Sequence, residues 1–216
     1  MILVFTGIIQ HLGTVVDMVS AAEGRRLRID VGPLAERLSP GASIAVDGAC
    51  LTVVSIAAVQ VDLDAVPETL SRTTLGDLRP GALVNLETSV PAGAPLDGHI
   101  VQGHVDGVAQ VANIQRGRRG HLLELTAPQE LTDQMVAKGS IALAGVSLTL
   151  VDVADGRFSV ALIPATLQRT TLGRLRNFDR ANVELDIIGK YVRRHLLALA
   201  GETGLTVEKL RKAGFA

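Results

Sequence analysis

The chain of 216 residues has one cysteine, no tryptophan and only five aromatic residues. A single cysteine excludes an internal disulfide and any zinc or iron–sulfur site built from several cysteines. So few aromatic side chains cannot form a base-stacking surface for nucleic acid. The net charge of −1, with both signs interspersed, gives no basic field for nucleic acid either. These absences leave nucleic-acid binding without support.

Long apolar runs are also missing, although 47% of the residues are hydrophobic. A membrane-spanning helix needs roughly 18 apolar residues, and charged or turn residues interrupt every stretch before that length. The first five residues, MILVF, carry neither a basic leader nor a small-residue cleavage site, so they do not predict a signal peptide. We therefore expect a soluble, cytoplasmic protein.

Two segments of the chain occur twice with the same offset of 97 residues. Residues 43–53 (SIAVDGACLTV) return as 140–150 (SIALAGVSLTL), and 69–76 (TLSRTTLG) return as 166–173 (TLQRTTLG). A shared offset excludes coincidence and predicts a duplicated domain. Each copy of roughly 90 to 95 residues is large enough to bury its own core.

Each copy has the pattern of short β-strands separated by Gly, Pro and Asp residues. Strands are predicted over 14–19, 26–31, 43–54, 59–63 and 83–87, and 182–185 closes the second copy. Short helices fit at 34–38 and 129–137. Five or six evenly spaced strands favour a small closed barrel, which leaves no sheet edge unpaired.

The end of the chain departs from the repeat. Residues 91–95 (PAGAP) predict a linker, and the expected domains are 1–95, 96–188 and 189–216. An unrepeated amphipathic helix is typical of docking or oligomerisation. One face of this helix is predicted to contain Tyr191, His195, Leu196 and Leu199, and the helix is predicted to end at Gly201. A second short helix is predicted to follow, with Thr206 as its N-cap and Glu208 in its first turn.

The duplicated segments carry different potentially reactive side chains at one position, where Cys50 in the first copy matches Ser147 in the second. A lone cysteine in a strand can be a small buried hydrophobic residue. It can also be a nucleophile or an acid–base group, for which it needs a partly exposed, electropositive setting. Serine at the matched position favours a site that faces a pocket.

Two histidines lie close together in residues 98–107 (GHIVQGHVDG). The spacing of five between His99 and His104 sends them to opposite faces of a strand, which disfavours a shared metal. Either can be a hydrogen-bonded histidine at a strand end. His104 is the better functional candidate, because Gly103 precedes it and leaves the backbone bare for a flat ligand.

Other motifs are less specific. Ser43 and Ser140 lack the second glycine of a nucleophile elbow, and the Gly-rich loops match neither the dinucleotide nor the P-loop fingerprint. Residues 72–76 (RTTLG) and their copy could form an anion-binding turn or a structural hairpin connection. Both interpretations stay open.

Taken in order, residues 5–9, 43–53, 68–76, 98–107 and 186–192 and the second-half repeat motifs resemble the riboflavin synthase family over essentially the whole chain. The resemblance implies two six-stranded Greek-key β-barrels and a C-terminal helix that gathers three chains, with an active site between barrels of neighbouring subunits. It implies a cofactor-free dismutation of two 6,7-dimethyl-8-ribityllumazine molecules into riboflavin and 5-amino-6-ribitylaminouracil. The implied partners are this substrate, two further copies of the chain and lumazine synthase.

The resemblance also implies which residues form the site. Its likeliest chemical groups are Ser43, Cys50 and His104, with Phe5 flanking the pocket. One lumazine would contact the N-terminal barrel through Gly7, Ile8, Ile9, Cys50, Leu51, Thr52, Asp64, Ala65, Val66, Pro67, Glu68 and Thr69. The other would contact the C-terminal barrel through Gly103, His104, Val105, Ser147, Leu148, Thr149, Ala161, Leu162, Ile163, Pro164, Ala165 and Thr166, and Lys138 would reach a ligand across the subunit boundary.

The chemistry fits these residue types. A base such as His104 could take a proton from a methyl group of the electron-poor ring, while water, Ser43 or Cys50 could add to the ring carbon that bears the other methyl. Stacking two rings supplies proximity.

The sequence departs from the family in two places. Residues 2–4 stand before Phe5, where members begin Met-Phe-Thr-Gly, so they either crowd the pocket or mark a start at Val4. Ala165 stands where a larger polar residue often lies opposite Glu68.

Two other functions are possible on a similar barrel. A lumazine- or flavin-binding antenna protein of this fold could keep one pocket and lose the other, but here both copies keep their Ser/Thr motifs and Cys50, His104 and Lys138 are present. A flavin reductase would need a nucleotide-binding domain, for which no residues remain.

Overall fold

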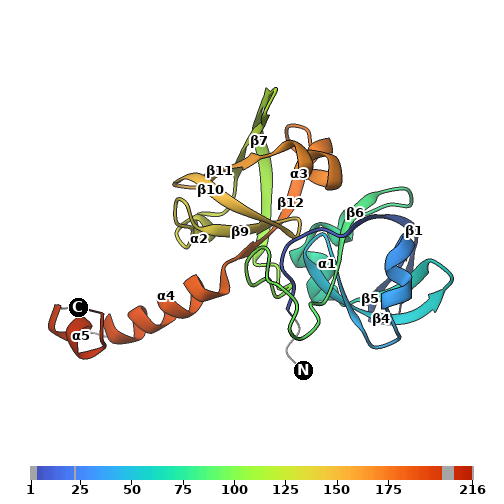
Figure 1. Ribbon diagram of the computed structural model, residues 1–216, viewed down its shortest axis with the longest axis horizontal. Helices are drawn as coiled ribbons and strands as arrows, with labels where there is room; N and C mark the ends of the chain where they lie inside the picture. The colour runs from blue at the N-terminus through green and yellow to red at the C-terminus, as the bar shows by residue number, and fades with distance from the viewer. Residues whose placement is uncertain (1–3, 22, 201–206, 216) are drawn as a thin grey trace.

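A computed structural model describes residues 4–21, 23–200 and 207–215, and in them the strands form two closed antiparallel barrels (Figure 1). The first barrel has the strand order β1-β2-β5-β4-β3-β6. Its strands are β1 (His11–Ala21), β2 (Gly24–Asp30), β3 (Ser43–Val46), β4 (Ala49–Ala57), β5 (Gln60–Ala65) and β6 (Leu83–Thr88).

The second barrel repeats this arrangement with the order β10-β11-β8-β7-β12-β9. Its strands are β7 (Gly107–Gly117), β8 (Gly120–Thr126), β9 (Ser140–Leu143), β10 (Val146–Ala154), β11 (Arg157–Leu162) and β12 (Arg180–Leu185). The predicted all-β fold of two six-stranded barrels is confirmed.

Alternation along the strands explains how each barrel fills its interior. In β2, Leu27 and Ile29 are fully buried, whereas Arg28 points outward. On that outer face Arg28 pairs with Asp62 on β5 at 2.7 Å. Because the arginine side chain is half exposed, water and salt screen this pair, and it adds little to stability. The stability of each barrel therefore comes mainly from its apolar interior.

One predicted strand is in fact two. Residues 43–54 are interrupted by a tight turn at Asp47 and Gly48, both with positive φ (44° and 81°). Positive φ at both central residues is the geometry that joins two antiparallel strands with their natural twist. The second copy has the same turn at Ala144 and Gly145 (47° and 77°). The Asp47-Gly48 dipeptide is a typical signal of such a turn, whereas Ala144-Gly145 in the second copy is a weaker one.

The short helices connect strands and are close to the predicted positions. The segment expected at 34–38 is a 3₁₀ turn over Gly32–Arg37, and the helix expected over 129–137 is only α2 (Gln129–Thr132). Between the fifth and sixth strand of each barrel a short α-helix is followed by a 3₁₀ turn. These are α1 (Pro67–Arg72) with η2 (Thr74–Asp77), and α3 (Pro164–Arg169) with η3 (Thr171–Arg174).

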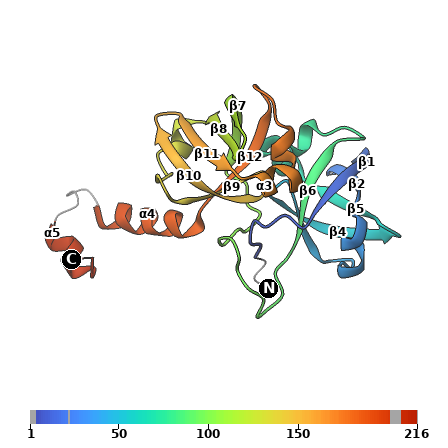
Figure 2. The ribbon, with the colours of Figure 1, turned by 45° about the horizontal axis from the view of Figure 1, so that its top comes forward.

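The C-terminal segment leaves the barrels. Helix α4 (Ile187–Ala200) projects away from both of them, and α5 (Val207–Lys212) follows at its far end (Figures 1 and 2). The predicted stop at Gly201 and N-cap at Thr206 lie outside the described residues, as do the side chains of Leu199 and Glu208. No helix in the described part of the chain is long and apolar enough to cross a membrane.

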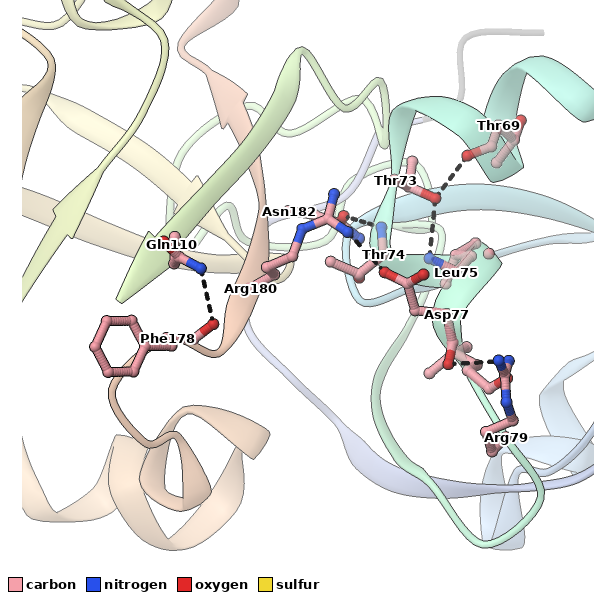
Figure 3. Close-up of polar contacts among 12 residues, drawn as sticks. Thr69, Thr73, Thr74, Leu75, Asp77, Arg79, Gln110, Phe178, Arg180 and Asn182 are labelled. Atoms are coloured by element: carbon pink, nitrogen blue, oxygen red, sulfur yellow. Dashed lines mark hydrogen bonds and ion pairs between the residues drawn. The ribbon is translucent and has the colours of Figure 1, made fainter. Parts of the chain in front are cut away.

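The two barrels meet through a reciprocal pair of asparagines. Asn182 on β12 donates through Nδ2 to the carbonyl of Asp47 at 2.8 Å. Its Oδ1 accepts from the backbone N–H of Thr74 at 2.7 Å (Figure 3). In the same way, Asn85 on β6 donates through Nδ2 to the carbonyl of Ala144 at 2.9 Å, and its Oδ1 accepts from the backbone N–H of Thr171 at 2.8 Å. The barrels are thus related by an approximate twofold arrangement.

Candidate functional site

The chain segment that leads into each barrel docks on the other barrel. The carbonyl of Gly7, just before β1, accepts the backbone N–H of Ser147 on β10 at 2.8 Å. The carbonyl of Gly103, just before β7, accepts the N–H of Cys50 on β4 at 2.9 Å. We call residues 4–10 and 98–106 the crossing segments. Each of these contacts therefore joins the two halves of the chain.

A buried glutamate anchors each crossing segment. Glu87 at the end of β6 accepts the amides of Thr6 and Gly7 at 2.7 and 2.9 Å. Glu184 on β12 accepts those of Gln102 and Gly103 at 2.7 and 2.9 Å. Burial raises the pKa of both carboxyls, and the amide hydrogen bonds oppose that rise. These carboxyls satisfy backbone donors that would otherwise be orphaned.

Glycine is required where the crossing segments touch the barrels. Gly103 has φ +77°, and a Cβ there would lie 2.5 Å from the Cβ of Cys50. Gly7 has φ +76°, and its Cβ would lie 2.7 Å from the Cβ of Ser147. Any side chain would both strain the backbone and push the segment off the strand. The two glycines flagged by the sequence therefore permit close backbone approach.

A cavity of about 400 Å³ opens beside Cys50. It brings together six residues expected at the site, namely Cys50, Glu68, Thr69, Gly103, His104 and Val105, and it adds Ala49, Arg72, Thr73 and Asp106.

The grouping differs from the expected one. Gly103, His104 and Val105 were assigned to the C-terminal barrel with Ser147, but they line the pocket of the first barrel. Val105 packs against the first core and Ile9 against the second. The crossing of the segments, which the sequence does not reveal, is the reason.

Cys50 is half-buried, and its thiol shares a hydrogen bond with Ser43. Burial raises the pKa of the Cys50 thiol, the bond from Ser43 lowers it, and the charge of Glu184 raises it. The net direction is upward, so the group is a neutral thiol at pH 7. A neutral thiol can donate a hydrogen bond or a proton, and it is a weak nucleophile until it is deprotonated.

The RTTLG motif is part of the wall of this cavity. Arg72 at the end of α1 pairs with Glu68 at 2.7 Å, and Thr73 caps η2 by accepting the Leu75 amide at 3.1 Å. The Thr74 amide is occupied by Asn182 across the barrel interface. Because these amides bond within the protein, the structural interpretation of the motif is favoured over the anion-binding one, and the connection is helical instead of a hairpin.

The remaining expected residues of the first barrel lie outside this cavity. Leu51 and Ala65 are in the barrel core, and Asp64 pairs with Arg26 on the outer face. Thr52 and Val66 are exposed, as is Pro67, where α1 begins. Ser43 is buried and lines a separate cavity of about 780 Å³ with Val4 and residues 89–94. Phe5 is fully buried and pairs with Val101 of the other crossing segment.

On the second barrel, Ser147 occupies the position matched to Cys50, and its Oγ lies 2.7 Å from the Nδ1 of His99. Ile8, Lys138 and Thr149 are exposed, Leu148 and Thr166 are half-buried, and Leu162 belongs to the core. Ala161, Ile163, Pro164 and Ala165 are exposed around the start of α3. Ala165 is the residue of the second repeat that matches Glu68, and its methyl group cannot make the polar contact of a larger side chain.

Sequence reasoning missed the anchors Glu87 and Glu184 and the interface residues Asn85 and Asn182. A signal was present, because an Asn-x-Glu pattern recurs at the offset of 97 inside otherwise apolar strands. It also missed that Lys190 on α4 pairs with Asp106 at 2.6 Å. That ion pair ties the base of α4 to the crossing segment that carries His104.

Comparison with known proteins agrees with this architecture. The model of the lumazine binding domain family matches residues 6–89 and 102–186. Riboflavin synthases of Actinobacillus pleuropneumoniae and Bacillus subtilis are 36% and 38% identical, covering 98% of this chain and all of theirs. That of Chlamydia pneumoniae is 43% identical over 86% of this chain and 92% of its own.

A solved structure has the same fold. The crystal structure of LumP complexed with riboflavin superposes with a TM-score of 0.78 at 27% identity, covering 84% of this chain and 98% of that one. The relatives named riboflavin synthase are more similar in sequence and cover 86% to 98% of the chain. With two lumazine-binding repeats, two closed barrels and full-length relatives of one kind, the chain belongs to the riboflavin synthase family.

Proposed function

We propose that this chain is a riboflavin synthase, which converts two molecules of 6,7-dimethyl-8-ribityllumazine into riboflavin and 5-amino-6-ribitylaminouracil. One molecule donates a four-carbon unit and the other accepts it, so the two products together contain all atoms of the two substrates. The proposal rests on the cavity at Cys50, where one half of the chain supplies the thiol and the other half supplies His104.

The side chains around the cavity suit proton transfer. His104 is exposed at the cavity, with its backbone fixed by Gly103 on Cys50, so its ring can reach a methyl group of a bound lumazine and act as base. The Cys50 thiol is protonated at neutral pH and can donate to a ring nitrogen or oxygen. Water is then a better candidate than Cys50 for addition to the ring. Holding two rings together supplies the rest by proximity.

We further propose that three chains assemble through α4 and that the reacting pair lies between the first barrel of one chain and the second barrel of its neighbour. Helix α4 projects from the barrels (Figure 2). Its side chains Ile188, Tyr191 and Val192 are exposed at three- and four-residue spacing, which places them on one face, and Leu197 is exposed on another face. Water-exposed apolar side chains on one face favour a partner helix. Light scattering that gives a monomer would contradict the assembly, and co-sedimentation with lumazine synthase would test the further association.

The domain division also stands as a proposal. A first lumazine-binding unit over 1–95, a second over 96–188 and an oligomerisation tail over 189–216 agree with the positions of the barrels and α4.

The deciding experiment is optical. The protein is incubated with ribityllumazine alone, and riboflavin is followed by its absorbance and fluorescence. We expect product without any added cofactor, together with strongly reduced turnover in Cys50→Ser and His104→Gln. Full turnover in both variants would overturn the residue assignment. Tight binding without product would instead indicate a non-catalytic, lumazine-binding antenna protein of the same fold.

A further inference from the structure

The matched polar side chains Cys50 and Ser147, which belong to the two proposed lumazine sites, have different partners. The Cys50 thiol bonds to Ser43, which lies on the neighbouring strand β3 of the same barrel. Ser147 Oγ instead meets the imidazole of His99 at 2.7 Å, and His99 comes from a crossing segment. Counted from Gly7 against Gly103, the position matched to His99 in the first repeat is Leu3, which has no polar side chain. An imidazole partner is thus specific to the second pocket.

The backbone delivers His99 to this serine. The His99 amide donates to the carbonyl of Thr6 at 3.2 Å, and Val101 pairs with Phe5 two residues later. A Cβ at the preceding Gly98 would collide with the Thr6 carbonyl and lie 3.0 Å from the Cβ of Ser147. The contact is therefore built by the crossing of the two segments.

The surroundings of the ring select its tautomer. Burial lowers the pKa of His99, so the ring is neutral at pH 7, and the charge of Asp186 opposes this only in part. Nε2 is buried and has no hydrogen-bond partner in the described part of the chain. A buried N–H without a partner is rarer in proteins than an unsatisfied acceptor. The proton is then on Nδ1, which donates to Ser147 Oγ.

This assignment orients the hydroxyl. With Nδ1–H donating to Oγ, the hydroxyl proton of Ser147 is left for another acceptor. The Ser147 amide is already bound to the carbonyl of Gly7 at 2.8 Å. Both backbone and side chain of Ser147 are therefore fixed, and only the O–H remains for a ligand.

We propose that His99 is a positioning residue of the second pocket, which fixes Ser147 as a hydrogen-bond donor to a carbonyl oxygen or ring nitrogen of the bound lumazine. The inference rests on the proposed function, because it names the ligand as ribityllumazine. It gives the two pockets different hydrogen bonding to identical molecules, which is what opposite roles as donor and acceptor require.

The test uses a matched pair of substitutions. His99→Asn keeps a donor near the position of Nδ1, whereas His99→Gln moves the amide toward the position of Nε2, and His99→Leu removes it. We expect kcat/KM for ribityllumazine to fall on the order of tenfold in the Leu and Gln variants, as for the loss of one well-made hydrogen bond, and to stay within about threefold in Asn. Equal losses in Asn and Gln would overturn the proposal.

A double-mutant cycle with Ser147→Ala tests the coupling. If His99 acts through Ser147, His99→Leu lowers kcat/KM no further once Ser147 is alanine. Fully additive losses would contradict the proposal. Nitrogen-15 NMR of the histidines of the full-length protein provides an independent readout, with Nδ1 protonated in His99; the opposite tautomer would also overturn it.

The proposed function can fail separately. If the wild-type protein makes no riboflavin, the same variants are compared by fluorescence titration with ribityllumazine. Asn retaining affinity while Gln and Leu lose it would still support the role of His99, and unchanged affinity in all three would refute it.

Discussion

The Asp47 carboxyl, in the turn where the two barrels touch, is buried, and its matched residue is Ala144. Burial raises the pKa of Asp47 to about 7, although the carboxyl accepts a hydrogen bond from the backbone N–H of Asn85 at 2.8 Å. The unfolded chain ionises such a group near pH 4. Between these values the folded state binds the extra proton, so the free energy of unfolding falls as the pH rises from about 4 to about 7.

Asp47→Asn is expected to remove this penalty. The amide oxygen can still accept from Asn85, and asparagine tolerates the positive φ of the turn. The variant should gain about 1–4 kcal/mol in the free energy of unfolding at pH 8 and little at pH 4, measured by urea unfolding at both. The matched control Asp77→Asn removes the exposed pair with Arg180 (Figure 3) and should change stability by less than about 1 kcal/mol. A gain that is equal at pH 4 and pH 8 would contradict the explanation.

Cys50 allows a second prediction, because it is the chain's only cysteine. With the pKa of its thiol raised by burial, alkylation by iodoacetamide should be slow at pH 7 and should accelerate beyond the pH at which a free cysteine is already fully ionised. Mass spectrometry gives the rate directly. Bound ribityllumazine should protect the thiol, whereas rapid labelling at pH 7 would show that Cys50 is a thiolate.

Among the elements, the crossing segments depend most on single residues. In Glu184→Gln one carboxylate oxygen becomes an NH₂ group that faces a backbone N–H of Gln102 or Gly103. Leaving a buried donor unsatisfied costs about 1–3 kcal/mol. We expect faster hydrogen exchange over residues 98–104 and lower turnover, because this segment carries His104.

Glu87→Gln is the matched control for that prediction. It should loosen residues 5–8 and leave exchange over residues 98–104 nearly unchanged, since Glu87 holds the amides of Thr6 and Gly7. Loosening of both segments in either variant would show that they are one cooperative unit instead of two.

Alternation and the repeat were sufficient to predict the barrels, because each strand buries one face against its own core. The turn at Asp47 was missed although Asp47-Gly48 is a typical hairpin signal, because residues 43–54 were read as one strand. The composition of the Cys50 pocket was predicted in part, through Cys50, Glu68 and His104. Their grouping was not, because a pocket wall supplied by another domain leaves no periodicity in the sequence. Arg72 was predicted only as part of a possible anion-binding turn, and Asp106 was not assigned to the site.

At the scale of the whole molecule, the reciprocal asparagines hold the barrels together. Asn182→Ala would leave the Thr74 amide and the Asp47 carbonyl without their partner, and Asn85→Ala would do the same to Thr171 and Ala144. Each substitution should destabilise by about 1–3 kcal/mol in urea unfolding. The double variant should lose less than the sum, because once one contact is gone the interface relaxes at the other. Strict additivity would show that the two contacts are independent.

The exchange of crossing segments also bears on how such a protein can change over generations. A substitution near Gly103 is inherited with the second repeat but alters the pocket of the first, and one near Gly7 does the reverse. Substitutions in the crossing segment of one repeat therefore alter the site on the other repeat. If residues 98–106 were replaced by those of a distant relative without matching changes in β4 and α1, the cavity at Cys50 on the first barrel would be disrupted, although none of the replaced residues belongs to that barrel.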